Sequence, residues 1–183
     1  MMKFSATVTL QYDTPFSSFS HEQWRDGLDW MKQSNLDGAE LCISNYENID
    51  PYKIKEELDI RGLGCSTLST GQARGLEGLS LIGVLPDKVR ETQKRFLQHI
   101  DTAATLGSKV TIGLMRGLGT EVTKSQDLHN LSEALKPLIE YADKKGVILL
   151  LEAINRYETA LLNSAEADMD FIVNDLGNPD CVG

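Results

Sequence analysis

Two glutamates lie six residues apart in the segment "LLLEAINRYE", and carboxylates are side chains that can move a proton or hold a cation. Glu152 directly follows the three leucines 149–151. A run this apolar is expected to be buried, and a buried carboxylate is costly unless something pairs with it. Glu152 therefore either forms a salt bridge, for instance to Arg156 or Arg116, or binds a cation. Glu158 taken alone is more typical of a surface loop.

The elements that must position these glutamates follow a repeating pattern. Short apolar runs, most of them with a glycine close before the run, alternate with longer stretches of helical periodicity. Strands that alternate with helices of this length indicate parallel strands with the helices outside. The predicted strands cover residues 3–10, 38–43, 62–68, 107–115, 146–152 and the fragment 181–183.

The first two predicted helices have recognisable start signals. Ser20 is expected to cap the first helix, with Gln23 three residues later as its capping-box partner. Asp50 followed by Pro51 begins the second, because proline suits the first helical position.

Three further helices are predicted in the second half of the chain. One covers about 87–106 and stops at Gly107, and the next covers about 126–145, where Pro137 should kink or split it. The last follows Ser164 and ends at Gly177. The apolar stripe of the helix at 87–106 consists of Phe96, Ile100, Ala103 and Ala104.

Two α/β architectures fit this pattern: a doubly wound open sheet and a (β/α)8 TIM barrel. A doubly wound nucleotide-binding sheet normally has a glycine-rich loop after its first strand, whereas "QYDTPFSSFS" contains no glycine. The barrel is therefore favoured. A full barrel takes about 250 residues, so residues 1–183 are expected to form a single incomplete barrel domain, with about five βα units and the start of strand six, apparently truncated at the C-terminus. Glu152 then ends strand five at the barrel mouth, and the leucines pack the barrel wall.

Composition narrows the possible partners and the compartment. The net charge of −9 argues against nucleic acid, and no basic run suits an anionic membrane. No 18-residue apolar segment and no signal-peptide core is present, so a cytoplasmic protein is expected. Cys42, Cys65 and Cys181 are widely spaced in predicted strands and are expected to be reduced and buried.

The segment "LEAINRYE" closely resembles the strand-five motif of the xylose-isomerase-like sugar isomerases and epimerases, and it is nearest to the D-tagatose and D-psicose 3-epimerase branch. Weaker similarities follow in order along the chain, in "GAELCIS", "LSTGQA" and "TIGLMRG". The resemblance covers only the N-terminal two-thirds of that family's barrel. The positions that match the strand-five motif are Glu152, Asn155, Arg156, Tyr157 and Glu158.

The resemblance implies a chemistry for these positions. Glu152 is expected to be a metal ligand and one of two catalytic glutamates that move a proton beside a ketose carbonyl. A divalent cation, Mn²⁺, Mg²⁺ or Co²⁺, would stabilise the enediolate that forms. Glu158 would bind a substrate hydroxyl, while Arg116 would bind a hydroxyl or phosphate or else form a salt bridge across the barrel mouth. Asn155 and Arg156 are expected to order the loop.

The chain departs from the family pattern in one respect. The remaining ligands, an aspartate, a histidine and a second glutamate, come from strands six, seven and eight. Strand six is cut off at Gly183 in this chain, so none of those positions is present. The histidines it does contain, His21, His99 and His129, fall in or beside predicted outer helices and are expected to be solvated.

The sequence thus predicts a metal-dependent sugar or sugar-phosphate isomerase or epimerase, inactive as this chain alone. A first alternative is a non-enzymatic, incomplete barrel whose open edges are covered by a second copy, in a homo-oligomer. A second alternative is a related barrel enzyme such as a hydroxypyruvate isomerase or an inosose dehydratase. An endonuclease-IV-like enzyme is disfavoured by the acidic charge.

Overall fold

The structure is a computed structural model that describes residues 2–14 and 17–183. Its strands form one parallel sheet in the order β1-β2-β3-β4-β5, the same order as in the chain. A doubly wound sheet reverses its strand order partway, so this sequential order is that of a barrel wall and confirms the predicted TIM-barrel class. The strands are β1 (Ser5–Thr9), β2 (Gly38–Cys42), β3 (Gly64–Ser69), β4 (Lys109–Ile112) and β5 (Leu149–Leu151).

A sixth strand begins at the C-terminus, as predicted. Val182 forms an isolated parallel bridge with Leu149. The Leu149 and Leu151 amides donate to the carbonyl oxygens of Cys181 and Gly183 at 2.8 Å each. The outer edge of β5 is therefore already paired with the last residues of the chain.

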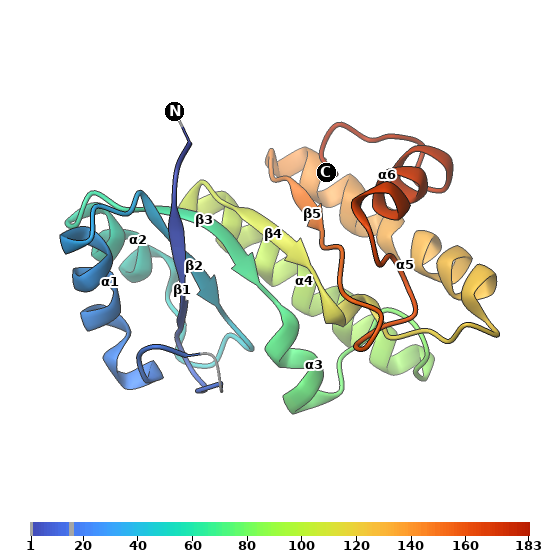
Figure 1. Ribbon diagram of the computed structural model, residues 1–183, viewed down its shortest axis with the longest axis horizontal. Coiled ribbons are helices and arrows are strands. Elements are labelled where there is room, and N and C mark those ends of the chain that lie inside the picture. Colours follow the sequence, from blue (N-terminus) through green and yellow to red (C-terminus); the bar gives the residue numbers. More distant parts are fainter. Residues whose placement is uncertain (1, 15–16) are drawn as a thin grey trace.

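Helices cover one face of the sheet, and Figure 1 shows α4 and α5 behind the strands, with α1 and α2 beside β1 and β2. Short 3₁₀ helices precede α1, at His21–Gln23, and follow β4, at Leu114–Arg116. No described helix is both long and apolar enough to cross a membrane. The α-helices are α1 (Trp24–Gln33), α2 (Pro51–Asp59), α3 (Gly71–Glu77), α4 (Pro86–Leu106), α5 (Lys124–Lys145) and α6 (Ala165–Asn174).

Of the five predicted helix starts, those at Asp50 and Ser164 are confirmed by side-chain caps, and the cap predicted at Ser20 is wrong in detail. The Asp50 carboxylate accepts from the amides of the first turn of α2, and the Ser164 hydroxyl accepts from the Ala167 amide at 3.2 Å. Ser20 makes no side-chain bond to a helix amide; its hydroxyl instead donates to the Gln23 side chain at 3.1 Å. The chain there begins with a 3₁₀ turn, which presents its amides differently from an α-helix.

Other expectations for the helices also change. Pro137 does not split α5, which runs unbroken through it. Because proline has no N–H, one hydrogen bond of the helix is missing there. Nearby, Gln93 on α4 donates to the carbonyl of Ala134, one turn before Pro137, at 2.9 Å. The last helix ends at Asn174 instead of Gly177. Helix α3 was not predicted, because its seven residues include two glycines and lie within a glycine-rich loop.

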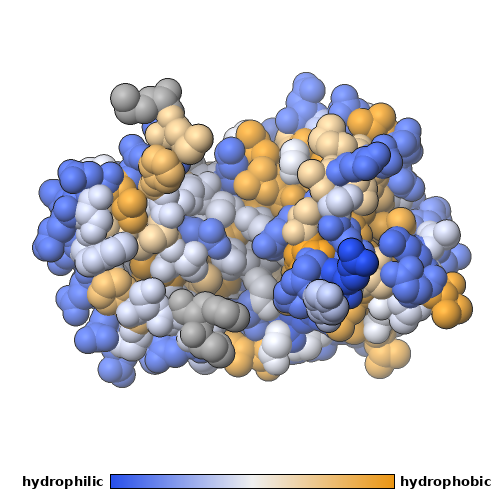
Figure 2. Space-filling model, in the orientation of Figure 1, coloured by the Kyte–Doolittle hydropathy of each residue, from blue (hydrophilic) through white to orange (hydrophobic). Residues whose placement is uncertain are grey.

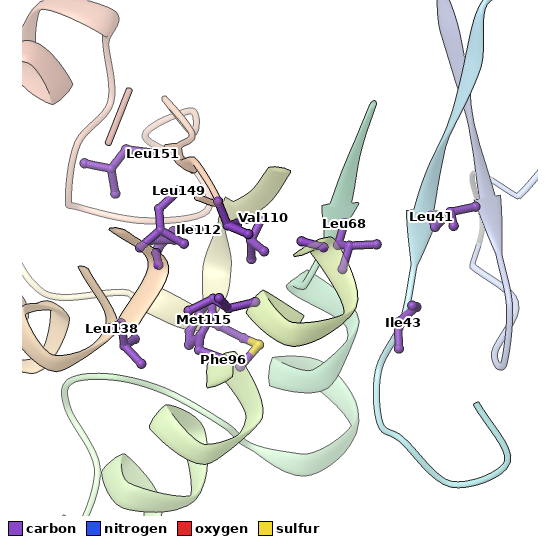
Figure 3. Close-up of a cluster of buried hydrophobic side chains, with 14 of the residues drawn as sticks. Leu41, Ile43, Leu68, Phe96, Val110, Ile112, Met115, Leu138, Leu149 and Leu151 are labelled. Atoms are coloured by element: carbon purple, nitrogen blue, oxygen red, sulfur yellow. The ribbon is translucent and has the colours of Figure 1, made fainter. Parts of the chain in front are cut away.

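The core lies between the outer face of the sheet and helices α1, α2, α4 and α5. Figure 3 shows Val110, Ile112 and Leu149 from neighbouring strands, with Phe96 beside Met115. Leu149 and Leu151 are both buried, as expected of leucines that pack a barrel wall. The side chains of the three cysteines are also buried and unpaired, as predicted.

The prediction that His99 is solvated is wrong, because its side chain is 0% exposed. It lies between Phe96 and Ile100 on the inward stripe of α4, so helical periodicity directs it into the core. Its Nδ1 pairs with the Tyr46 hydroxyl at 2.9 Å, and burial lowers its pKa to about 3. His21 and His129 lie on outer helices, as expected.

The inner face of the sheet carries hydroxyl groups. Thr67 on β3 and Thr111 on β4 share a hydrogen bond of 2.8 Å across the strands. The Thr70 hydroxyl donates to the Thr111 carbonyl, also at 2.8 Å. Figure 2 shows a mostly pale surface of intermediate hydropathy over the middle of this face. Polar side chains therefore follow the barrel interior up to its mouth.

Candidate active site at the carboxyl ends of the strands

A cavity of about 360 Å³ lies where β3, β4 and β5 end. The C-terminal ends of β3 and β4 point the same way in Figure 1, and the loop after β5 lies beside the end of β4. Parallel strands bring their carboxyl ends to one edge, so residues far apart in sequence meet here. The cavity is lined by Ser69, Thr70, Gly71, Thr111, Gly113, Leu114, Ala153, Ile154, Asn155 and the two glutamates Glu152 and Glu158.

Glu152 lies at the end of β5, where the sequence placed it, and its side chain is exposed to this cavity. Among residues 2–14 and 17–183, no ion pair or hydrogen bond to its carboxylate is formed. The expected alternative, a salt bridge to Arg156 or Arg116, is therefore not formed in the described part of the chain. The carboxylate is available to a ligand in the cavity.

Glu158 lies in the same cavity and is held by its own loop. Asn155 donates from its side-chain amide to the Glu158 carboxylate and accepts from the Tyr157 amide at 3.0 Å. The Glu158 amide in turn donates to the Asn155 carbonyl at 3.1 Å. Asn155 thus orders the loop, as predicted. Arg156 and Tyr157 are exposed.

Arg116 lies in the connection after β4, but it does not line the cavity. Its side chain is 0% exposed, and its guanidinium donates to the carbonyl oxygens of Glu152, Leu161 and Leu162 at 2.5, 2.9 and 3.1 Å. Burial lowers the pKa of Arg116, while the charges of Asp168 and Glu152 act in the opposite direction. In this arrangement its donors face the protein backbone and not a substrate.

Sequence reasoning missed one charged residue of the barrel interior, Glu40 in the middle of β2. Burial and the nearby charge of Glu152 raise the pKa of Glu40, and a hydrogen bond with Ser69 acts against that rise. The available signal was its position: Glu40 interrupts an otherwise apolar strand, and alternation directs it opposite to Ala39 and Leu41, which are buried toward the helices. Beside it, burial raises the pKa of Cys42 to about 11, so this thiol is protonated at neutral pH.

The donors of the site suit a hard cation but do not form a complete metal site. Within the described ranges, no group of three or more His, Cys, Asp or Glu side chains could hold an ion. The lining donors are carboxylate, hydroxyl and amide oxygens, the ligands preferred by Mg²⁺ and Mn²⁺. This chain therefore contributes Glu152 as one candidate ligand.

A larger cavity of about 740 Å³ lies between the loop after β2 and helices α3 and α4, and it shares no lining residue with the first. Arg95, one of the two cations that line it, is already paired with Glu77 at 2.9 Å and donates to the Ser44 carbonyl. The unpaired carboxylate of Glu152 makes the smaller cavity the better candidate for chemistry.

The fold is similar to those of several solved epimerases. The 3-keto-D-glucoside 4-epimerase YcjR from E. coli matches with a TM-score of 0.72 at 18% identity, over 98% of this chain and 66% of that chain. The D-allulose 3-epimerase from Methylomonas sp., in complex with D-allulose, gives 0.72 at 19% identity, over 97% of this chain and 60% of that chain. The D-psicose 3-epimerase from Clostridium cellulolyticum H10, with D-tagatose, matches with a TM-score of 0.71 at 17% identity, over 99% of this chain and 62% of that chain. The chain thus spans less than two thirds of the length of each of these structures.

The sequence itself matches a family model over most of its length. Residues 28–183 match the model described as "Xylose isomerase-like TIM barrel". Among curated proteins, none matches the chain. The family match agrees with the sequential parallel sheet and with the resemblance seen in "LEAINRYE". The chain therefore belongs to the xylose isomerase-like TIM-barrel family.

Proposed function

We propose that this chain forms the N-terminal two-thirds of a divalent-metal-dependent sugar or sugar-phosphate isomerase or epimerase, in which Glu152 moves a proton at a carbon next to a ketose carbonyl. One observation carries the proposal: the Glu152 carboxylate lies unpaired at the barrel mouth, in a cavity that it shares with Glu158. An unpaired carboxylate that faces a walled cavity is suited to act as a base or as a cation ligand.

The remaining lining groups suit a polyhydroxylated substrate. The Glu158 carboxylate, oriented by Asn155, accepts hydrogen bonds from sugar hydroxyls close to the reacting carbon. Hydroxyl side chains such as Ser69 and Thr70 both donate and accept, so they complement the same groups. The family relationship and the names of the structural neighbours support a sugar as the substrate.

A divalent cation would be held in part by Glu152. When bound, such an ion supplies positive charge that stabilises the enediolate formed as the proton leaves. Glu152 takes the proton from carbon through one carboxylate oxygen, and proton return from a second acid on the opposite side inverts that carbon. The other ligands and this second acid are not among the described groups of the cavity.

The test uses the protein at its natural length, freed of metal with EDTA and then supplied with Mn²⁺, Mg²⁺ or Co²⁺. Free ketohexoses and ketose phosphates are incubated in D₂O, and NMR records deuterium entering next to the carbonyl together with any epimer formed. Metal-dependent exchange is expected, and Glu152→Gln should reduce its rate by roughly 10²–10⁴-fold.

Two further variants distinguish the effect of changing the cavity from the effect of changing an exposed residue elsewhere. Asn155→Ala should weaken sugar binding about tenfold by releasing Glu158, with a smaller change in the maximal rate. Glu166→Gln is the matched control, because Glu166 is an exposed acid at the start of α6 that does not line the cavity. Exchange that is absent from the wild type with every metal and sugar, or unchanged in Glu152→Gln, rules out the proposal.

A further inference from the structure

Arg116 is the largest fully buried side chain of the described structure. Three of its four backbone acceptors lie at the two ends of one segment, the loop 152–162 that follows β5. The fourth is the Ile112 carbonyl at the end of β4, which Nη1 reaches at 3.4 Å. Glu152 begins this loop and Leu162 ends it, just before the N-cap of α6. A single guanidinium therefore joins the start of the loop to its end.

The contacts use the particular geometry of arginine. Nη1 reaches the Glu152 carbonyl, and Nη2 reaches both the Leu161 and the Leu162 carbonyl. A planar guanidinium can present these donors together, whereas the ammonium group of a lysine is a single point. Replacing Arg116 with lysine would therefore keep the charge but lose most of the anchoring.

Burying this cation is unfavourable, which makes its position informative. No ion pair within 4.0 Å joins Arg116 to an acid in the described ranges, and its Nε has no hydrogen-bond partner there. Asp168, in the first turn of α6, is also buried, and its Oδ1 is likewise without a partner. A cation in such surroundings is retained only where its hydrogen bonds replace its hydration.

The loop has a backbone conformation that needs an anchor. Leu162 has a φ of 54°, in the left-handed region that bulky residues rarely adopt. Its carbonyl accepts from Arg116 and also from the Ile154 amide at 3.3 Å. Beside Arg116, Met115 is fully buried next to Phe96 (Figure 3), so the connection after β4 is itself fixed in the core.

We propose that Arg116 is a positioning residue: it holds the Glu152, Leu161 and Leu162 carbonyls and thereby fixes the loop 152–162, so that the Glu152 and Glu158 carboxylates face the cavity. This assignment differs from the substrate contact expected from the sequence, because both Nη atoms of Arg116 donate to backbone carbonyls and not to a ligand in the cavity. The consequence for metal binding rests on the proposed function, whereas the anchoring of the loop does not.

The first experiment measures the loop without metal or sugar. Hydrogen exchange is followed by mass spectrometry in the natural-length protein, comparing wild type, Arg116→Lys and Arg116→Met. Peptides that contain the amides of Ile154 and Ala160 should exchange at least ~10-fold faster in both variants, while peptides of β1 to β3 keep their rates. Arg95→Lys is the matched control, because it alters a partly buried arginine that also donates to a carbonyl, that of Ser44, and its hydrogen bonds involve no residue of this loop.

The second experiment separates positioning from general stability. Mn²⁺ binding is measured by electron paramagnetic resonance in Arg116→Lys and Arg95→Lys, at a temperature at which both are fully folded. Mn²⁺ affinity should fall at least ~10-fold in Arg116→Lys and not in Arg95→Lys. If the wild type binds no Mn²⁺ but the loop still exchanges faster in Arg116→Lys, the anchoring stands and the proposed function fails.

An unchanged exchange rate for residues 152–162 in Arg116→Lys overturns the inference. If neither Arg116 variant folds, NMR of the wild type decides the question instead. Nη protons of Arg116 that exchange slowly at neutral pH support the bonds to the three carbonyls, and protons that exchange as fast as those of exposed arginines contradict them.

Discussion

The Glu152 carboxylate occupies the space that a side chain on Gly113 would fill. A Cβ built on Gly113, at the end of β4, would lie 2.6 Å from Glu152 Oε2. The absence of a side chain on Gly113 therefore allows the carboxylate that follows β5 to take its observed position. The two residues directly follow the neighbouring strands β4 and β5, and the Glu152 amide donates to the Ile112 carbonyl next to Gly113 at 3.4 Å.

Gly113→Ala should displace the Glu152 carboxylate with little loss of fold stability. The clashing atom is the far end of a flexible side chain, so we expect less than about 1 kcal/mol of destabilisation by urea denaturation. In a double-mutant cycle with Glu152→Ala, a coupling of about 0.5–1 kcal/mol should appear. A crystal structure of Gly113→Ala should show the carboxylate moved.

Gly75→Ala is the control for this substitution. Gly75 lies within α3, and no atom within 4 Å meets its added Cβ. A double-mutant cycle of Gly75→Ala with Glu152→Ala should give no measurable coupling energy. Full additivity between Gly113→Ala and Glu152→Ala, with an unmoved carboxylate, would contradict the assigned contact.

Glu40→Gln should change how stability depends on pH. The pKa of Glu40 is raised in the folded state, so its favourable contribution is complete below the pKa of the unfolded chain and is lost as pH rises through the folded pKa. Glutamine does not ionise. The variant should therefore gain stability relative to wild type between pH 4 and pH 8, by about 1.4 kcal/mol for each unit by which the pKa is raised.

Urea denaturation at the two pH values checks this prediction. Glu121→Gln serves as the control, because Glu121 is an exposed acid in the loop before α5. Parallel pH profiles for wild type and Glu40→Gln would show that burial does not perturb this carboxyl.

His99→Phe should make the protein less sensitive to mild acid. The pKa of His99 is lowered from its usual value near 6.5 to about 3 by burial and by the charge of Arg95. Because the pKa of His99 is lower in the folded state than in the unfolded state, the neutral side chain contributes to stability at pH values above about 6.5. That contribution is lost as the pH falls from about 6.5 toward 3. Wild type should lose up to about 1.4 kcal/mol per pH unit more than the variant across this window.

The measurement is the free energy of unfolding between pH 7 and pH 5. The variant also loses the hydrogen bond to Tyr46, so only the slope is compared and not the absolute stability. His129→Phe removes an exposed histidine on α5 as the control. Equal slopes for wild type and His99→Phe would rule out a buried, neutral His99.

The alternation of strands and helices, the position of Glu152 and the start of a sixth strand could all be predicted from the sequence. Each depends on local patterns: apolar runs, glycines that end helices at 107 and 146, and caps such as Asp50 and Ser164. The family motif around Glu152 is also local, because its residues are contiguous in the chain.

The tertiary structure decided which polar side chains are buried and what they contact. Arg116 is turned toward the carbonyls of a loop that begins 36 residues later, and Glu40 comes near Glu152 only because the sheet curves toward a barrel. His99 is buried because α4 packs its stripe against the core, although histidine is common on surfaces. Local periodicity determines the direction of a side chain relative to its own element, whereas its hydration depends on what the rest of the chain places opposite it.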